Sequence, residues 1–598
     1  MISQDSEINH ELNKRAPVFR DYDFLTAEWH KCPADRADVE FIFHHLSKLP
    51  DQLKRLVLNN ALKIESRRDR NLYILNTTKR IVDFLPAKLR YSLTVDDEEI
   101  RKIAEESADR CRRLATLHNV KFRYSASMPQ SVKGFDNSVT KGTNPLRSNH
   151  INRNPVNVTG SNSPLTEISV TDTSETYRVL TEYIETFRID PIAVTSHGVT
   201  ELGAIKRMCN KNWWIRRLRK IFNQAYEQAA IELILVNKYK QIYASDLTVT
   251  KRKQQLFRNE QIMSSMLVIN DIGQQYSLKD LSDLNVSNPQ VRKAELMVRM
   301  RGFEELSQEH GHKGIFITIT CPSKYHATYA KSGQRNVKYE NLTPYQGNQY
   351  LCSVWSRIRA EWNRQEIKPY GFRVAEPQHD GTPHWHILLF VEEKHITTVK
   401  NVVSHYGLQE DGDEKGALEN RCDFKLIDPK KGSATGYIAK YVSKNIDGKG
   451  LDVGVYGEDP ITAAQRVDAW SSCWCIRQFQ QIGGASVSVW RELRRLKQSM
   501  GKDTLIEKAR QAADESKWND YINVMGGVFV KRKDQPLTLA YELASNIETG
   551  ECKLGYYDGN FIKNIKGILY KGQMIITRFF SWRMEKTGTD FSNLEFCK

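Results

Sequence analysis

A long polar segment divides this chain and excludes a single continuous fold. From Ser125 to about Ser174 the sequence, which begins "SASMPQSVKGFDNSVTKGTNPLRSNH", is rich in Ser, Asn, Thr, Gly and Pro and nearly free of large apolar side chains. Such a segment cannot bury enough apolar surface to offset the entropy lost on ordering. We therefore expect a disordered linker at 125–177, preceded by a helical N-terminal domain at 1–124.

Length and charge narrow the class of protein. A chain of 598 residues exceeds what one hydrophobic core usually supports, so several domains are expected. The net charge of +16 favours a polyanionic partner, above all nucleic acid. No apolar run approaches the roughly 18 residues of a membrane-spanning helix. The first residues do not resemble a secretory signal, so the expected location is the cytoplasm.

The most concentrated basic stretch, "IKRMCNKNWWIRRLRK", lies in a region of helical pattern at 178–295. Cations beside flat indole rings suit a phosphate backbone with an unstacked base nearby. An amphipathic helix with core tryptophans and solvated cations is the alternative interpretation. The candidate DNA-binding residues are Arg207, Trp213, Trp214, Arg216, Arg217 and Arg219. Further basic runs begin at Thr250 and at Trp490.

Between 296 and 450 the pattern becomes mixed α/β. "GIFITIT" and "GFRVAEP" have the β-branched and aromatic content of strands, and a helical pattern starts at Tyr350. The turn "QHDGTP" joins "GFRVAEP" to a further strand, "HWHILLFV", so the two strands should form a hairpin.

The hairpin suggests a metal site. Residues two apart on a strand project to the same face, so His384 and His386 would present two imidazoles side by side, while Trp385 points to the other face. A third ligand should come from across the turn, where Glu376 and His379 are both available. A His-x-His pair alone is weak support for metal binding.

A second group of residues lies in "GYIAKYVSKN". Tyr437, Lys440, Tyr441 and Lys444 are spaced so that a helix would place them in one stripe. The alternative is that the tyrosines are core-edge residues and the lysines only solubilise the helix. If the two groups act together, a divalent ion would polarise a phosphate, and a lysine would favour the phenolate of a tyrosine whose ordinary pKa is about 10. The product would be a covalent phosphotyrosine that can be reversed.

"EPQHDGTPHWHILLF" together with "YIAKYVSKN" resembles the HUH endonucleases, and specifically their two-tyrosine branch, represented by the replication gene A proteins of P2-like phages. "FITITCPSKYH", "VSNPQVRKAELMVRMRGFEELSQEHGHKGIF" and "WCIRQFQQIGGASVSVWRELRRL" are also similar to this branch. The resemblance covers about residues 200 to 500.

The resemblance implies an HUH nuclease domain at 296–450, with a central antiparallel sheet flanked by helices. A partly basic α/β region is expected at 451–598. The resemblance also implies that His384 and His386 bind a metal and that Tyr437 and Tyr441 are nucleophiles. Glu376 matches an acidic third ligand, although the neighbouring His379 leaves that position open. Mg²⁺ is the usual ion of the family, and Mn²⁺ also suits two imidazoles.

The resemblance further implies rolling-circle initiation. The protein would nick single-stranded origin DNA, keep a 5′-phosphotyrosyl link, leave a 3′-OH for a host DNA polymerase and rejoin strands at termination. No GxxxxGK[ST] loop occurs, so we expect no nucleotide cofactor and the need for a host helicase. The alternatives are a two-tyrosine transposase, a non-cleaving origin-binding protein and a zinc hydrolase that uses His384, His386 and Glu376.

Overall fold

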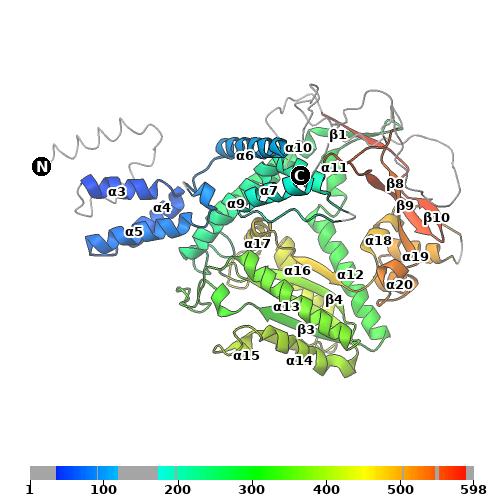
Figure 1. Cartoon of the computed structure of the whole chain (residues 1–598). Coiled ribbons are helices and arrows are strands. Elements are labelled where there is room, and N and C mark those ends of the chain that lie inside the picture. Colours follow the sequence, from blue (N-terminus) through cyan, green and yellow to red (C-terminus); the bar gives the residue numbers. More distant parts are fainter. Residues whose placement is uncertain are drawn as a thin grey trace. The chain divides into compact units, whose positions relative to one another are not determined.

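The computed structural model describes residues 36–90, 92–118, 173–195, 198–501, 504–545 and 551–586. Contacts divide the chain into two compact units, 1–96 and 97–598 (Figure 1). The predicted linker at 125–177 lies outside the described residues as far as 172, and helix α7 begins at Thr173. In the described ranges, no helix combines the length and the apolar character that crossing a membrane requires.

The described part of the first unit is helical. It contains α3 (Arg36–Leu46), α4 (Asp51–Ala61), α5 (Arg67–Val82) and a short 3-10 turn at Ala87–Leu89. The Ser66 side chain caps α5 by accepting a hydrogen bond from the Asp69 amide, and Leu53, Val57 and Ile74 are buried in the core. These residues agree with the prediction of a mainly helical N-terminal region.

The second unit begins with helices. They are α6 (Asp97–Leu117), α7 (Thr173–Glu185), α8 (Glu201–Met208), α9 (Lys211–Glu232), α10 (Asp246–Ser264) and α11 (Leu278–Asp283). A three-stranded sheet follows α10, in the order β11-β1-β2, from β1 (Met266–Asn270), β2 (Gln275–Ser277) and β11 (Trp582–Lys586). The last described strand of the chain therefore pairs with a strand more than halfway back along the sequence.

A five-stranded antiparallel sheet forms the centre of the second unit. Its strands are β3 (Lys313–Thr320), β4 (Tyr370–Pro377), β5 (Pro383–Val391), β6 (Cys422–Leu426) and β7 (Phe479–Ile482), in the order β6-β3-β5-β4-β7. The β4–β5 pair confirms the predicted hairpin, and the sheet confirms the prediction of antiparallel strands combined with many helices.

Helices cover both faces of this sheet. On one face, α12 (Pro289–Glu309) and α16 (Ala434–Ile446) pack on it, with Phe372, Leu388 and Ile438 in one buried cluster. On the other face lie α13 (Pro344–Arg364) and α14 (Ile396–Gly407) (Figure 1). The Trp385 indole of β5 donates a hydrogen bond to Asn348 of α13 at 3.3 Å. Alternate residues of β5 therefore pack against the helices on opposite faces of the sheet.

The C-terminal part of the second unit also combines helices and strands. It comprises α17 (Pro460–Trp474), α18 (Val487–Leu493), α19 (Leu505–Asp514), α20 (Trp518–Val524) and a sheet in the order β10-β9-β8 made of β8 (Leu537–Leu543), β9 (Lys563–Tyr570) and β10 (Gln573–Ile576). Trp490, Trp518 and Tyr521 pack against one another in its core.

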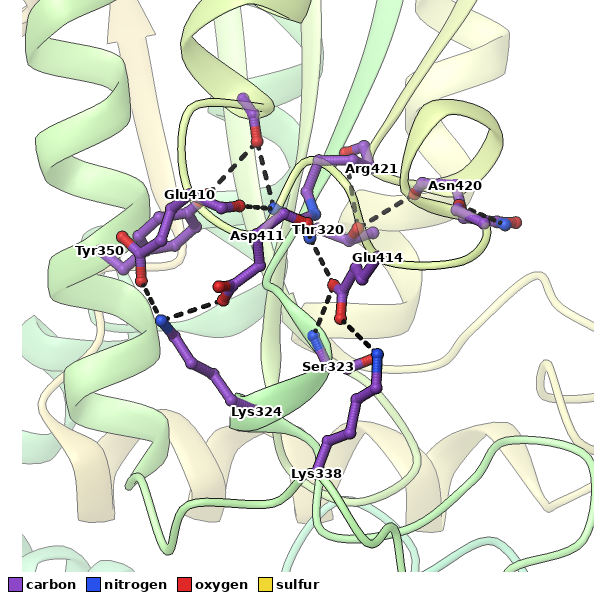
Figure 2. A network of polar contacts seen from close by, with 12 residues as sticks. Thr320, Ser323, Lys324, Lys338, Tyr350, Glu410, Asp411, Glu414, Asn420 and Arg421 are labelled. Carbon is purple, nitrogen blue, oxygen red and sulfur yellow. Dashed lines mark hydrogen bonds and ion pairs between the residues drawn. The ribbon is translucent and has the colours of Figure 1, made fainter.

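A buried arginine fixes the segment between α14 and β6, which includes α15 (Ala417–Asn420). The Arg421 guanidinium, 2% exposed, donates to the carbonyls of Gly407 and Glu410 and to the carboxylate of Glu414 at 2.6 Å (Figure 2). Glu414 also accepts a hydrogen bond from the Ser323 amide. The network joins this segment to the residues that follow β3. The strand β3 itself forms one edge of the candidate site.

Replacing Arg421 with alanine should destabilise the second unit. The change leaves Glu414 without its buried partner and several carbonyls without a donor, a loss of about 3 kcal/mol in unfolding free energy. The measurement is the midpoint of chemical denaturation, with hydrogen exchange at 407–421 as the local readout. Lys338→Ala is the matched control, because its pair with Glu414 is longer, 3.6 Å, and half exposed. Equal effects of the two changes would contradict the role of Arg421.

Candidate functional site

Three potential metal ligands meet on the β4–β5 hairpin. Antiparallel pairing sets Glu376 directly opposite His384, and His386 follows two residues later on the same face. One ligand atom from each of the three side chains lies within 4.8 Å of the other two. It is the one group of three or more His, Cys, Asp or Glu side chains with metal-binding spacing among the described residues.

The two imidazoles have the protonation state that a cation requires. His386 shares a 3.1 Å hydrogen bond between its Nδ1 and the Thr318 hydroxyl, and its Nε2 lies 3.6 Å from Glu376 Oε2. Burial lowers the pKa of His386 to about 3 and that of His384 well below its usual range, so both rings are neutral at pH 7. His384 Nδ1 is buried without a hydrogen-bond partner. A metal ion that accepts the lone pair of this nitrogen would satisfy it.

Glu376 also ties the hairpin to helix α16. Its carboxylate, 1% exposed, accepts from Lys444 Nζ at 3.0 Å and from the Asn445 amide. Asn445 in turn accepts a hydrogen bond from Gln478, which directly precedes β7. The charge of Glu376 is thus partly balanced by Lys444, and the helix that carries the tyrosines is fixed at its C-terminal end to the ligand set.

His379 lies outside the three-ligand group. It is buried in the β4–β5 turn, where its Nδ1 lies 3.4 Å from the Thr328 hydroxyl and its ring lies 6.0 Å from that of Tyr456. The next residue, Asp380, is fully buried and forms an ion pair with His326 at 3.2 Å when that ring is protonated. Of the two sequence candidates for a third ligand, the structure therefore brings Glu376 to the histidines.

The two predicted tyrosines lie beside this group. Both are partly buried on α16 and contact the Phe316 ring of β3, with centroid distances of 4.7 Å for Tyr437 and 5.2 Å for Tyr441. Tyr441 also stacks close to His386, at 4.1 Å between ring centroids. The face of α16 that carries both tyrosines thus packs on the face of the sheet that carries the three potential ligands.

The electrostatics of the two tyrosines differ. Burial, followed by the nearby Tyr437 and Glu376, raises the pKa of Tyr441. Tyr437 has a cation beside it. Lys425 of β6 shares a hydrogen bond with the Tyr437 phenol, and this contact raises the pKa of the Lys425 side chain. Lys440 is exposed, whereas Lys444 is buried against Glu376. Sequence reasoning missed Lys425, whose only signal is a basic residue in a short strand far from the tyrosines.

The basic stretch at α8–α9 is placed differently from the DNA-binding interpretation. The indoles of Trp213 and Trp214 are 4% and 0% exposed, so neither ring is open to a nucleic-acid base. Arg207 is bound by Asp558 in two contacts and Arg219 pairs with Asp97. These positions correct the stacking role and fit an amphipathic helix with core tryptophans. Two residues of the set, Arg216 and Arg217, remain exposed.

Taken together, two neutral imidazoles, a carboxylate and two phenols on adjacent elements form a site suited to phosphoryl transfer to a side chain. Residues 166–449 match the family described as bacteriophage replication gene A protein, so this part of the chain is similar to that family.

Several relatives match a longer stretch. The replication gene A protein of Escherichia phage 186 is 41% identical over 64% of this chain and 56% of its own length. That of Escherichia phage P2 is 34% identical over 64% of this chain and 52% of its own. A probable replication endonuclease from a prophage-like region of Salmonella paratyphi A is 34% identical over 57% and 44%. The match thus spans about half the length of these relatives. No solved structure matches the chain.

Proposed function

We propose that this protein initiates rolling-circle replication as a two-tyrosine HUH endonuclease. The observation that carries the proposal is the contact between the tyrosines of α16 and the three potential metal ligands. The ring centroids of Tyr441 and His386 are 4.1 Å apart, and His386 belongs with His384 and Glu376 to the ligand set. Relatives named replication gene A protein and replication endonuclease support a role in phage DNA replication.

In the cleavage step, the phenolic oxygen of Tyr437 or Tyr441 attacks a phosphorus atom of one DNA strand. The bond from phosphorus to the 3′-oxygen breaks, and that oxygen takes a proton and leaves as a 3′-OH. The 5′-phosphate stays on the tyrosine as a diester, so no water is consumed and the step can run backwards. Lys425, which shares a hydrogen bond with Tyr437, places a cation beside this phenol. The second tyrosine can attack another strand while the first holds its own.

Glu376, His384 and His386 would hold the divalent ion, which we expect to be Mg²⁺ or Mn²⁺. Such an ion withdraws electron density from a non-bridging phosphate oxygen and so favours attack at phosphorus. The neutral imidazoles and the unpartnered Nδ1 of His384 suit this role. The substrate is single-stranded origin DNA, host helicase and DNA polymerase complete replication, and the site of action is the cytoplasm of the bacterial host.

The test is a covalent adduct. Purified protein is incubated with labelled single-stranded origin-region DNA, with and without Mg²⁺ or Mn²⁺, and separated on a denaturing gel. We expect a metal-dependent adduct that survives denaturation and disappears on protease treatment. Metal-dependent cleavage without an adduct would indicate the zinc-hydrolase alternative. Binding without cleavage across the origin region would indicate a non-cleaving initiator, and adducts at the ends of a mobile element would indicate a transposase.

Thr318→Val should weaken ion binding without removing a ligand. The Thr318 hydroxyl lies 3.1 Å from Nδ1 of His386, and when Nδ1–H donates to this hydroxyl the lone pair on Nε2 is free for an ion. Loss of such support typically costs 10–100-fold in metal affinity, and we expect a change of about tenfold. Titration calorimetry with Mn²⁺ measures it. Thr320→Val is the control, because its hydroxyl donates to backbone carbonyls of 420 and 421 instead. Equal losses would exclude the tautomer effect.

A further inference from the structure

A basic groove of about 990 Å³ lies along the β7 edge of the central sheet. Its walls come from β7, from the N-terminal half of α12, from α18 and from the chain after α20. Because β7 is the last strand in the sheet order, no strand among the described residues pairs with one side of its backbone. A groove of this kind offers both hydrogen-bonding backbone and side chains to an extended ligand.

The lining of the groove is strongly positive. Its cations are Arg292, Arg299, Lys368, Arg477, Arg491 and Arg532, and its one carboxylate is Glu295. That carboxylate already faces Arg491 at 2.7 Å and Arg299 at 3.5 Å. The other four cations form no ion pair with any described carboxylate, and Lys368, Arg477 and Arg532 are exposed. The groove therefore has an excess of positive charge that the protein itself does not neutralise.

Aromatic surface stands among these cations. The Phe529 ring lines the groove and is 47% exposed, and Phe479 of β7 is half-buried in its wall. Flat rings between cations suit single strands, whose bases are free to stack, better than a duplex, whose bases are already stacked on one another. The combination favours a single-stranded nucleic acid over a duplex or an acidic peptide.

The groove is connected to the candidate site. Gln478 lines it, and the Gln478 amide donates to Asn445, which donates to Glu376 of the ligand set. A strand lying in the groove would therefore be held within two hydrogen bonds of the ligands. The α8–α9 stretch offers neither such a connection nor an open ring.

We propose that this groove binds the single-stranded DNA that flanks the scissile phosphate, with Arg477 and Arg532 on the backbone and Phe529 under a base. For the identity of the strand, the inference rests on the proposed function. Substrate recognition would then take place at the β7 edge. Arg491, which lines the groove, belongs to the basic run that begins at Trp490.

Binding is measured separately from cleavage. The full chain carrying Tyr437→Phe and Tyr441→Phe is titrated, in EDTA, against fluorescein-labelled oligothymidine and an equally long duplex. Adding Arg477→Gln and Arg532→Gln should weaken oligothymidine binding by about tenfold or more and should lower the salt slope by about 1.4, since each lost phosphate contact removes about 0.7 on single strands. Adding Phe529→Ala instead should cost about fivefold or more on the single strand and little on the duplex.

Arg301→Gln with Lys394→Gln is the matched control, because both cations are exposed and lie outside the groove. Groove variants that bind like this control, or that lose the same affinity for duplex and for single strand, would overturn the inference. If groove variants lose binding but the unmutated protein forms no adduct, the groove stands and the proposed chemistry fails. If adducts form and groove variants bind normally, the reverse holds.

Discussion

Replacing both Tyr437 and Tyr441 with phenylalanine should abolish the covalent protein–DNA adduct, with a fall of about a thousandfold or more in the rate of strand cleavage. The change removes only the two attacking oxygens. It keeps the rings that pack against Phe316, so the fold should be unaffected. The measurement is adduct formation on a denaturing gel, together with DNA binding as a check that the substrate still docks.

The single variants should be unequal. Tyr441 is the more constrained, because its ring contacts both Phe316 and His386, whereas Tyr437 has Lys425 as its hydrogen-bond partner. We expect each single variant to keep part of the activity and their effects not to add. Tyr276→Phe, in the β11-β1-β2 sheet, is the control, since that ring is 41% exposed and takes no part in the site. An undiminished adduct in the double variant would rule out both phenols.

Removing a histidine of the ligand set should have the second large effect. His384→Ala and His386→Ala each take away one of three donors, and we expect at least about a hundredfold weaker Mn²⁺ binding and a similar loss of cleavage. Titration calorimetry and metal-dependent cleavage are the two readouts. Because both rings are neutral, their loss removes no charge that the core depends on.

His310→Ala provides a matched control, since it belongs to a second His-x-His pair, with His312, and is exposed. His379→Gln tests the sequence alternative for the third ligand. With His379 placed against Thr328, we expect little change in ion affinity, whereas Glu376→Gln should weaken it. Normal Mn²⁺ binding by both histidine variants would mean that the ion binds at a different site.

Local pattern was enough for the elements that carry the site. The Asp-Gly turn with flanking apolar runs predicted the β4–β5 hairpin, and residue spacing on α16 placed both tyrosines on one stripe. Both features depend on neighbours within a few residues. They can therefore be read from a single sequence.

Contacts between distant elements were not readable in this way. Nothing in the sequence separates Lys440, which is exposed, from Lys444, which is buried on Glu376. Cations around paired tryptophans fit a core helix as well as a binding surface, and only burial distinguishes the two for Trp213 and Trp214. Thr318 and Lys425 also depend on the β3 pairings, which join strands about seventy and a hundred residues apart.

The carboxylate of Glu376 contacts His386, Lys444 and Asn445, and Asn445 extends the contact to Gln478 in the groove wall. A group shared in this way makes ion binding and strand binding thermodynamically linked, because a shift in either partner is felt by the other. Linkage is reciprocal. Whatever factor the ion adds to the affinity for the strand, the strand must add to the affinity for the ion, so a positive coupling would make the protein hold its metal most tightly when DNA is in place.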